Sequence, residues 1–92
     1  MASTFHAAGT TGWQSLVVGS GSKRFGVQVV TTHPVLIHVG QSAPAADTQD
    51  YVLLSAERTR ELVLDLDAAD TVYVKSDAAT SVAVRGWKET RA

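Results

Sequence analysis

The chain of 92 residues is predicted to be all-β, and two features of the sequence support this fold class. First, stretches of strand length recur in which alternate residues are aliphatic, which is the period of a strand with one buried face. Second, short segments rich in Gly, Ser, Asp and Ala separate these stretches at a spacing of about 8–12 residues. About seven short strands of this kind favour a single-domain antiparallel β-sandwich, with a small β-barrel as the alternative.

The N-terminal residues differ in composition from the rest of the chain. Residues 1–12 are mostly small or polar, so we predict a loose N-terminal arm there, ahead of a β-sandwich domain over residues 13–92. Chain ends of this kind are poorly ordered unless side chains tie them down. Phe5 and His6 are the two side chains that could anchor this arm.

The first part of the sandwich domain contains four predicted strands, at residues 13–18, 25–32, 35–39 and 51–54. Pro34 separates the second strand from the third, because proline has no backbone N–H for a sheet and restricts the residue before it. Residues 41–50 have no periodicity and are predicted to form a surface loop. Residues 55–60 include good helix formers, but we predict a turn there because so short a helix would be marginal.

Three further strands are predicted at residues 61–66, 71–75 and 81–85, joined by short turns. Their alternate residues are aliphatic, namely Leu62, Leu64 and Leu66, then Val72 and Val74, then Val82 and Val84. Strand-length runs at this spacing indicate an antiparallel meander. We predict that this meander is the centre of the fold.

The composition excludes several classes of function. The formal net charge is −1 and no basic cluster exceeds the pair Lys23-Arg24, so we predict no binding to nucleic acid. The first residues lack the features of a signal peptide, and the longest aliphatic run, residues 35–37, is far too short for a membrane span. We therefore predict a soluble protein that binds no membrane. Because the chain has no cysteine, disulfides and thiolate metal sites are excluded.

No combination of side chains predicts catalysis, a metal or a cofactor. His33 and His38 are too far apart in sequence for a tight local chelate. Three carboxylates, Asp65, Asp67 and Asp70, have spacing like that of a calcium loop, but the glycine and the bidentate glutamate of an EF-hand are missing. Aspartates at a strand end are ordinary turn residues, which is the interpretation we adopt.

The outward positions of the predicted strands are less polar than a fully exposed face requires. Leu36, Val63 and Tyr73 fall at such positions, and Trp87 follows on the same side beyond the last strand. Single exposed apolar residues are common on protein surfaces, whereas aromatic residues near arginine are typical of the centre of a protein–protein interface. Both interpretations stay open from the pattern alone. The residues predicted to contact a partner are Phe5, His6, Trp13, Leu36, Val63, Tyr73 and Trp87.

A longer pattern covers residues 25–86. It consists of a strand that ends in glycine, a loop of small residues, a short strand with a small-residue turn, and two last strands that end in glycine. Its segments are residues 35–40, Asp50, residues 53–56, Glu61, residues 70–74 and residues 82–86. This pattern resembles the small β-sandwich structural proteins of tailed bacteriophages.

The resemblance implies a non-enzymatic component of the virion, most often a capsid decoration (cement) protein. Such proteins bind the outside of the shell where capsomers meet, commonly as trimers, and stabilise the head against the pressure of the packaged genome. The implied partners are the major capsid protein and further copies of this chain, with neither nucleic acid nor membrane. The implied location is the capsid surface, after synthesis in the host cytoplasm.

Two alternatives remain. One is a head–tail or tail-fibre accessory protein of the same kind of particle. The other is a carbohydrate-binding β-sandwich module, in which Trp13, Trp87 or Tyr73 would form a platform for a sugar ring beside a neighbouring aspartate.

Overall fold

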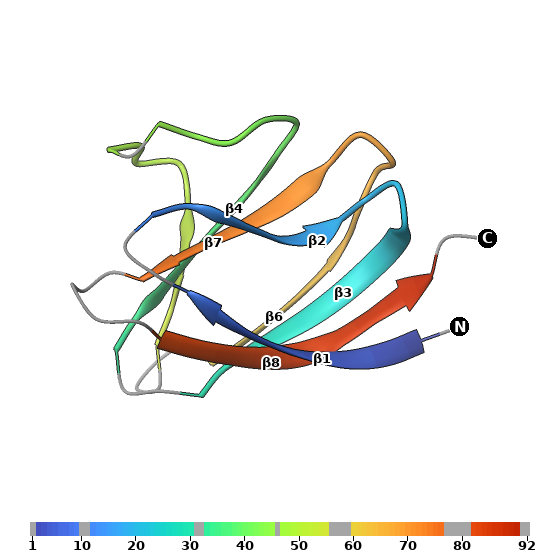
Figure 1. Ribbon diagram of the computed structural model, residues 1–92, viewed down its shortest axis with the longest axis horizontal. Helices are drawn as coiled ribbons and strands as arrows, with labels where there is room; N and C mark the ends of the chain where they lie inside the picture. Colours follow the sequence, from blue (N-terminus) through green and yellow to red (C-terminus); the bar gives the residue numbers. More distant parts are fainter. Residues whose placement is uncertain are drawn as a thin grey trace.

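Two four-stranded antiparallel sheets, packed face to face, make up the computed structural model of the chain (Figure 1). The structure describes residues 2–9, 12–30, 33–45, 47–55, 60–76 and 82–90. Within these residues every regular element is a β-strand, so the predicted β-sandwich is confirmed. The helical turn weighed for residues 55–60 falls largely on residues 56–59, which lie outside the described part of the chain.

The first sheet, sheet I, contains the first and the last strand of the chain. Its order is β1 (Ala2–Gly9), β8 (Val82–Thr90), β3 (Ser22–Val29) and β6 (Glu61–Asp65). The strands β1 and β8 run side by side, and the two ends of the chain lie at the same side of the molecule (Figure 1). β1 and β6 are the edge strands of this sheet.

The second sheet, sheet II, has the order β2 (Gln14–Val18), β7 (Thr71–Ser76), β4 (Val35–Gly40) and β5 (Val52–Leu54). Of the connections between the described strands, only that from β4 to β5 stays within one sheet. All the others cross between the two layers. These crossing connections therefore link the two sheets covalently at several places along the chain.

Alternate residues of both sheets fill the core between the layers. Val72 and Val74 of β7 are 0% and 1% exposed, and Val82 and Val84 of β8 are 2% and 0% exposed. Phe25 of β3 is fully buried among them. Full burial of one such side chain stabilises the fold by about 1.5–3 kcal/mol. The inward positions predicted for β7 and β8 are thus confirmed.

The predicted meander of residues 61–85 is wrong. β6 and β8 both lie in sheet I, but β3 lies between them, so they do not pair. β7 lies in sheet II. The period of two shows which side chains of a strand face the core, but the same pattern fits a strand in either layer. Short connections here cross the sandwich instead of forming hairpins.

The predicted loose arm is also wrong for residues 2–9, which form the strand β1. All eight of its residues pair with β8, from Ala2 with Glu89 to Gly9 with Val82. Phe5 packs against the core from the inner side of this strand. Backbone hydrogen bonds need no particular side chain, so a segment of small and polar residues can still complete a sheet when one large apolar residue fixes its position.

Candidate functional site

The seven residues predicted to contact a partner lie in three different places. His6, Val63 and Trp87 are on the outer face of sheet I, Trp13, Leu36 and Tyr73 are on the side of the outer face of sheet II, and Phe5 faces inward. The two outer faces are on opposite sides of the sandwich. One partner on one sheet face therefore cannot contact all seven.

Two of these residues are not exposed contacts. Phe5 packs against the core cluster, as described above. Leu36 is only 5% exposed, although it lies between the core residues Val35 and Ile37 on the strand and so faces away from them. Its neighbours across the strands are Leu53 and Lys75. Leu36 is thus already covered within the monomer, which corrects its assignment to an interface.

The outer face of sheet II carries an aromatic cluster whose members contact one another. The rings of Trp13 and His38 meet edge to face with 6.0 Å between centroids, and His38 lies 6.2 Å from Tyr73. Nζ of Lys75 lies 5.8 Å from the centroid of the Trp13 ring, within the range of a cation–π contact. Nδ1 of His38 donates to the backbone carbonyl of Asp50 at 2.7 Å. These contacts tie the loop before β5 to the sheet, so the cluster serves the fold.

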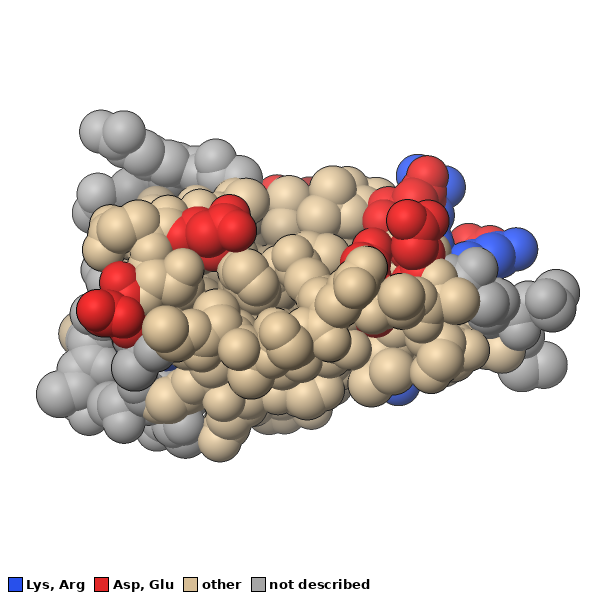
Figure 2. Space-filling view, turned by 90° about the horizontal axis from the view of Figure 1, so that it is seen from above, with Lys and Arg blue, Asp and Glu red and all other residues tan. Residues whose placement is uncertain are grey.

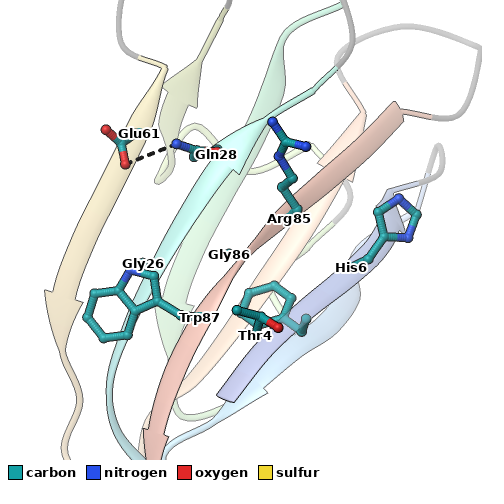
Figure 3. Close-up of a pocket in the computed structure, with 9 residues that line it drawn as sticks. Thr4, His6, Gly26, Gln28, Glu61, Arg85, Gly86 and Trp87 are labelled. Atoms are coloured by element: carbon teal, nitrogen blue, oxygen red, sulfur yellow. Dashed lines mark hydrogen bonds between the residues drawn. The ribbon is translucent and has the colours of Figure 1, made fainter. Parts of the chain in front are cut away.

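The outer face of sheet I carries a row of four polar side chains, one from each strand. Register places His6 of β1 opposite Arg85 of β8, Arg85 opposite Gln28 of β3, and Gln28 opposite Glu61 of β6. Nε2 of Gln28 donates to Oε2 of Glu61 at 3.3 Å (Figure 3). Directly opposed residues have Cβ atoms about 5 Å apart, so the four side chains form one continuous line across the sheet.

A second row runs beside the first and consists of Thr4, Trp87, Gly26 and Val63. Gly26 has no side chain, and a Cβ there would lie 2.5 Å from Nε1 of Trp87. The indole of Trp87 therefore lies over the glycine, in contact with the backbone of β3. Only a residue without a Cβ allows this approach.

The two rows enclose an open hollow of about 600 Å³, which we call the sheet I hollow (Figure 3). Its walls include residues of all four strands, with Trp87 and Glu61 on one side and Thr4 and His6 on the other. The guanidinium of Arg24 lies 6.0 Å from the centroid of the Trp87 ring, just outside the hollow. The sequence did not predict four of the residues that line the hollow, namely Thr4, Gln28, Glu61 and Arg85. They come from four different strands, and only the strand register brings them together.

A second opening, the β5–β6 groove, lies between the edge strands of the two sheets and has a volume of about 240 Å³. Leu62 and Leu64 of β6 line it from sheet I, and Val52 of β5 lines it from sheet II. Leu64 is paired with the buried Phe25 and so faces inward, yet it is 36% exposed. Val52 is 44% exposed although it is paired with the buried Ile37. The core is therefore open to solvent along this side.

No family model, curated protein or solved structure matches this chain. The relation to phage structural proteins remains a prediction from the sequence pattern. The chemistry of the two openings is therefore the basis for inferring a function.

Several acidic side chains of the described residues take part in ion pairs and in a turn. Within the described ranges, no group of three or more His, Asp or Glu side chains is placed to hold a metal ion. The predicted carboxylate cluster forms a turn, in which Oδ2 of Asp70 accepts from the backbone N–H of Asp67 at 3.3 Å. On the face shown in Figure 2, the acidic side chains gather towards its two ends, and most of the surface between them is uncharged.

In the described part of the chain, no helix is long and apolar enough to cross a bilayer.

Proposed function

We propose that the chain is a non-enzymatic structural protein of a tailed-bacteriophage particle, and that it acts there as a capsid decoration protein. The observation that carries this proposal is the β5–β6 groove, where inward-facing aliphatic side chains remain exposed. The resemblance over residues 25–86 gives the class of particle and the class of partner. The groove gives the surface through which the chain would bind.

The exposed apolar side chains concentrate on the two strands that border this groove. Six large apolar residues of the described chain are exposed, and four of them lie on β5 and β6, namely Val52, Leu53, Val63 and Leu64. Monomeric proteins usually protect an edge strand with charges, proline or a covering segment, because its unpaired backbone groups can pair with another chain. Val52 and Leu64 line the groove itself, whereas Leu53 and Val63 lie on the outer faces of sheets II and I. Exposed apolar surface at such an edge marks a protein contact.

The same surface suits a protein present in many copies. Two short apolar edges offer a small contact, and small contacts between proteins are weak when they act singly. Attachment at several neighbouring sites of a shell raises the effective concentration at each site, so the assembled protein is held far more tightly than one copy. With a formal net charge of −1, long-range attraction adds little, and the contact depends on apolar burial.

The test begins by sequencing the genes on either side of the gene for this chain; where they encode a major capsid protein, capsid shells are assembled from that protein. The purified chain is mixed with shells and sedimented, and the bound fraction is measured. We expect the wild-type chain to sediment with the shells. Leu64→Asp and Val52→Asp should each reduce the bound fraction at least tenfold, because a carboxylate in the groove would have to be buried on binding.

The matched control is Val18→Asp. Val18 is an exposed aliphatic residue at 48% but lies on β2, the opposite edge strand of sheet II, so its variant should bind like the wild type. Circular dichroism confirms that each variant is folded. A wild-type chain that leaves the shells bare, or groove variants that are folded and bind normally, would refute the proposal. Mass spectrometry of separated heads and tails then distinguishes decoration from a head–tail or tail-fibre role.

A further inference from the structure

The sheet I hollow has the size and the walls of a small-molecule site. Its volume of about 600 Å³ lies within the range of roughly 300–1,000 Å³ that is typical of ligand pockets. Because Gly26 has no side chain at an outward position between Arg24 and Gln28, the Trp87 indole can lie close against β3 at one side of the hollow. The hollow is distinct from the β5–β6 groove, because the residues lining the two openings are different.

Trp87 supplies a flat apolar surface at one side of the hollow. The side chain is half-buried, and in Figure 3 its indole is seen nearly face on, lying over β3. The face of an aromatic ring is electron-rich, and it attracts groups that carry partial positive charge, such as C–H bonds beside oxygen. A pyranose ring has one or both faces made of such C–H bonds. The indole can therefore pack against a sugar ring without stripping its hydroxyls of hydrogen-bond partners.

The polar row, which crosses the sheet beside the row that contains Trp87, supplies both donors and acceptors to the hollow. The guanidinium of Arg85 only donates, the carboxylate of Glu61 only accepts, and the amide of Gln28 between them does both. His6 extends the row on β1 with a ring that can donate or accept, and Thr4 adds a hydroxyl nearby (Figure 3). Each hydroxyl of a sugar is also both donor and acceptor, so neighbouring hydroxyls match this alternation.

The charges of the row select against ionic ligands. An anion is attracted by Arg85 but repelled by Glu61, and a cation is attracted by Glu61 but repelled by Arg85, so the two opposite charges largely cancel and neither kind of ion gains a large net attraction. Glu61 and Arg85 are both exposed and come from different strands, so both face the opening at once. The hollow is thus suited to a neutral molecule with one apolar face and several hydroxyls.

We propose that the sheet I hollow binds a neutral saccharide, with one ring packed on the Trp87 indole and its hydroxyls hydrogen-bonded to the row from His6 to Glu61. This function is separate from attachment to a capsid. It would give the chain a second contact surface, for glycan, in addition to the β5–β6 groove.

The chain contains a built-in internal control for the test, because it has two tryptophans. Trp87 lines the hollow, whereas Trp13 contacts His38 and Lys75 on the other sheet. The two indole N–H signals in a ¹H–¹⁵N NMR spectrum are followed during titration with glucose, galactose, mannose, N-acetylglucosamine and their β-linked disaccharides. We expect at least one of these sugars to shift the Trp87 signal saturably while the Trp13 signal stays in place.

Two carboxylate-to-amide variants separate a role in binding from a general effect of charge. Glu61→Gln removes a carboxylate acceptor from the hollow and should weaken binding at least fivefold. Asp47→Asn also neutralises a carboxylate, at an exposed residue that lines neither opening, and should leave binding unchanged. Arg85→Ala should weaken binding by a similar factor to Glu61→Gln.

Several results would overturn the saccharide site. These are no saturable shift of the Trp87 signal with any of the sugars, equal shifts of both indole signals, or equal losses of binding in Glu61→Gln and Asp47→Asn. Saturable binding of inorganic phosphate in place of the sugars would do the same. Glu61→Gln should still sediment with capsid shells, so failure of the saccharide site and failure of the decoration role are distinguishable.

Discussion

Replacing Phe5 with alanine tests whether β1 is an integral part of the sandwich. Phe5 is half-buried, is paired with Gly86 and packs against the core cluster. Truncation of a fully buried Phe costs about 3–5 kcal/mol, and a side chain that keeps some contact with water loses less, so we expect a loss of about 2–3 kcal/mol. For a domain of this size each kcal/mol lowers Tm by about 4–8 °C, so Tm should fall by roughly 8–24 °C.

Urea unfolding followed by circular dichroism measures this loss directly. The matched control is His6→Ala, because His6 is the next residue of β1 but is exposed on the outer face, where a substitution usually changes stability by less than about 0.5 kcal/mol. Amide hydrogen exchange supplies a second readout, since the N–H groups of β1 that bond to β8 should be protected. If Phe5→Ala is as stable as His6→Ala and the amides of residues 3–8 exchange freely, the segment is a loose arm and the described pairing is refuted.

Two other changes follow from close packing. Leu36→Asp should lower the free energy of unfolding by more than about 3 kcal/mol, because it places a carboxylate where the side chain is 5% exposed. Leu53→Asp, at the paired residue that is 40% exposed, should lower it by about 1 kcal/mol or less. Equal losses of the two variants in urea unfolding would contradict the burial of Leu36. Gly86→Ala should lower the free energy of unfolding by about 2 kcal/mol or more, because its Cβ would collide with the backbone carbonyl of Gly26. In the control Gly12→Ala the added Cβ meets no atom within 4 Å, so its Tm should change little. A Gly86→Ala chain as stable as Gly12→Ala would show that β8 and β3 are not so close.

The sequence predicts the fold class because aliphatic alternation survives in most strands of the sandwich. Val72 and Val74, like Val82 and Val84, were placed inward by their spacing alone, and they are almost fully buried. The same pattern could not reveal which layer a strand joins, since a strand with one apolar side fits either sheet. β1 was missed for a different reason, because its small residues show no alternation and only Phe5 marks its inner side.

The candidate sites were less predictable than the fold. Trp87 and Val63 were identified as outward residues, and the structure places both in one row of sheet I. The polar row beside them joins residues from the beginning, middle and end of the chain, and no local pattern connects His6 with Glu61. Such a site depends on strand order and register, which are fixed by long-range pairing rather than by neighbouring residues.

The pairing of β1 with β8 has a consequence for how the chain acquires its structure. Within the described chain β8 is the only neighbour of β1, and Ala2 pairs with Glu89 across almost the whole length of the sequence. Loops that long are slow to close, and contacts between distant residues delay folding. During synthesis, β1 emerges well before β8 and must therefore wait for it before it can pair. The same strand that finishes sheet I thus sets the interval in which the unfinished chain is open to aggregation or to a chaperone.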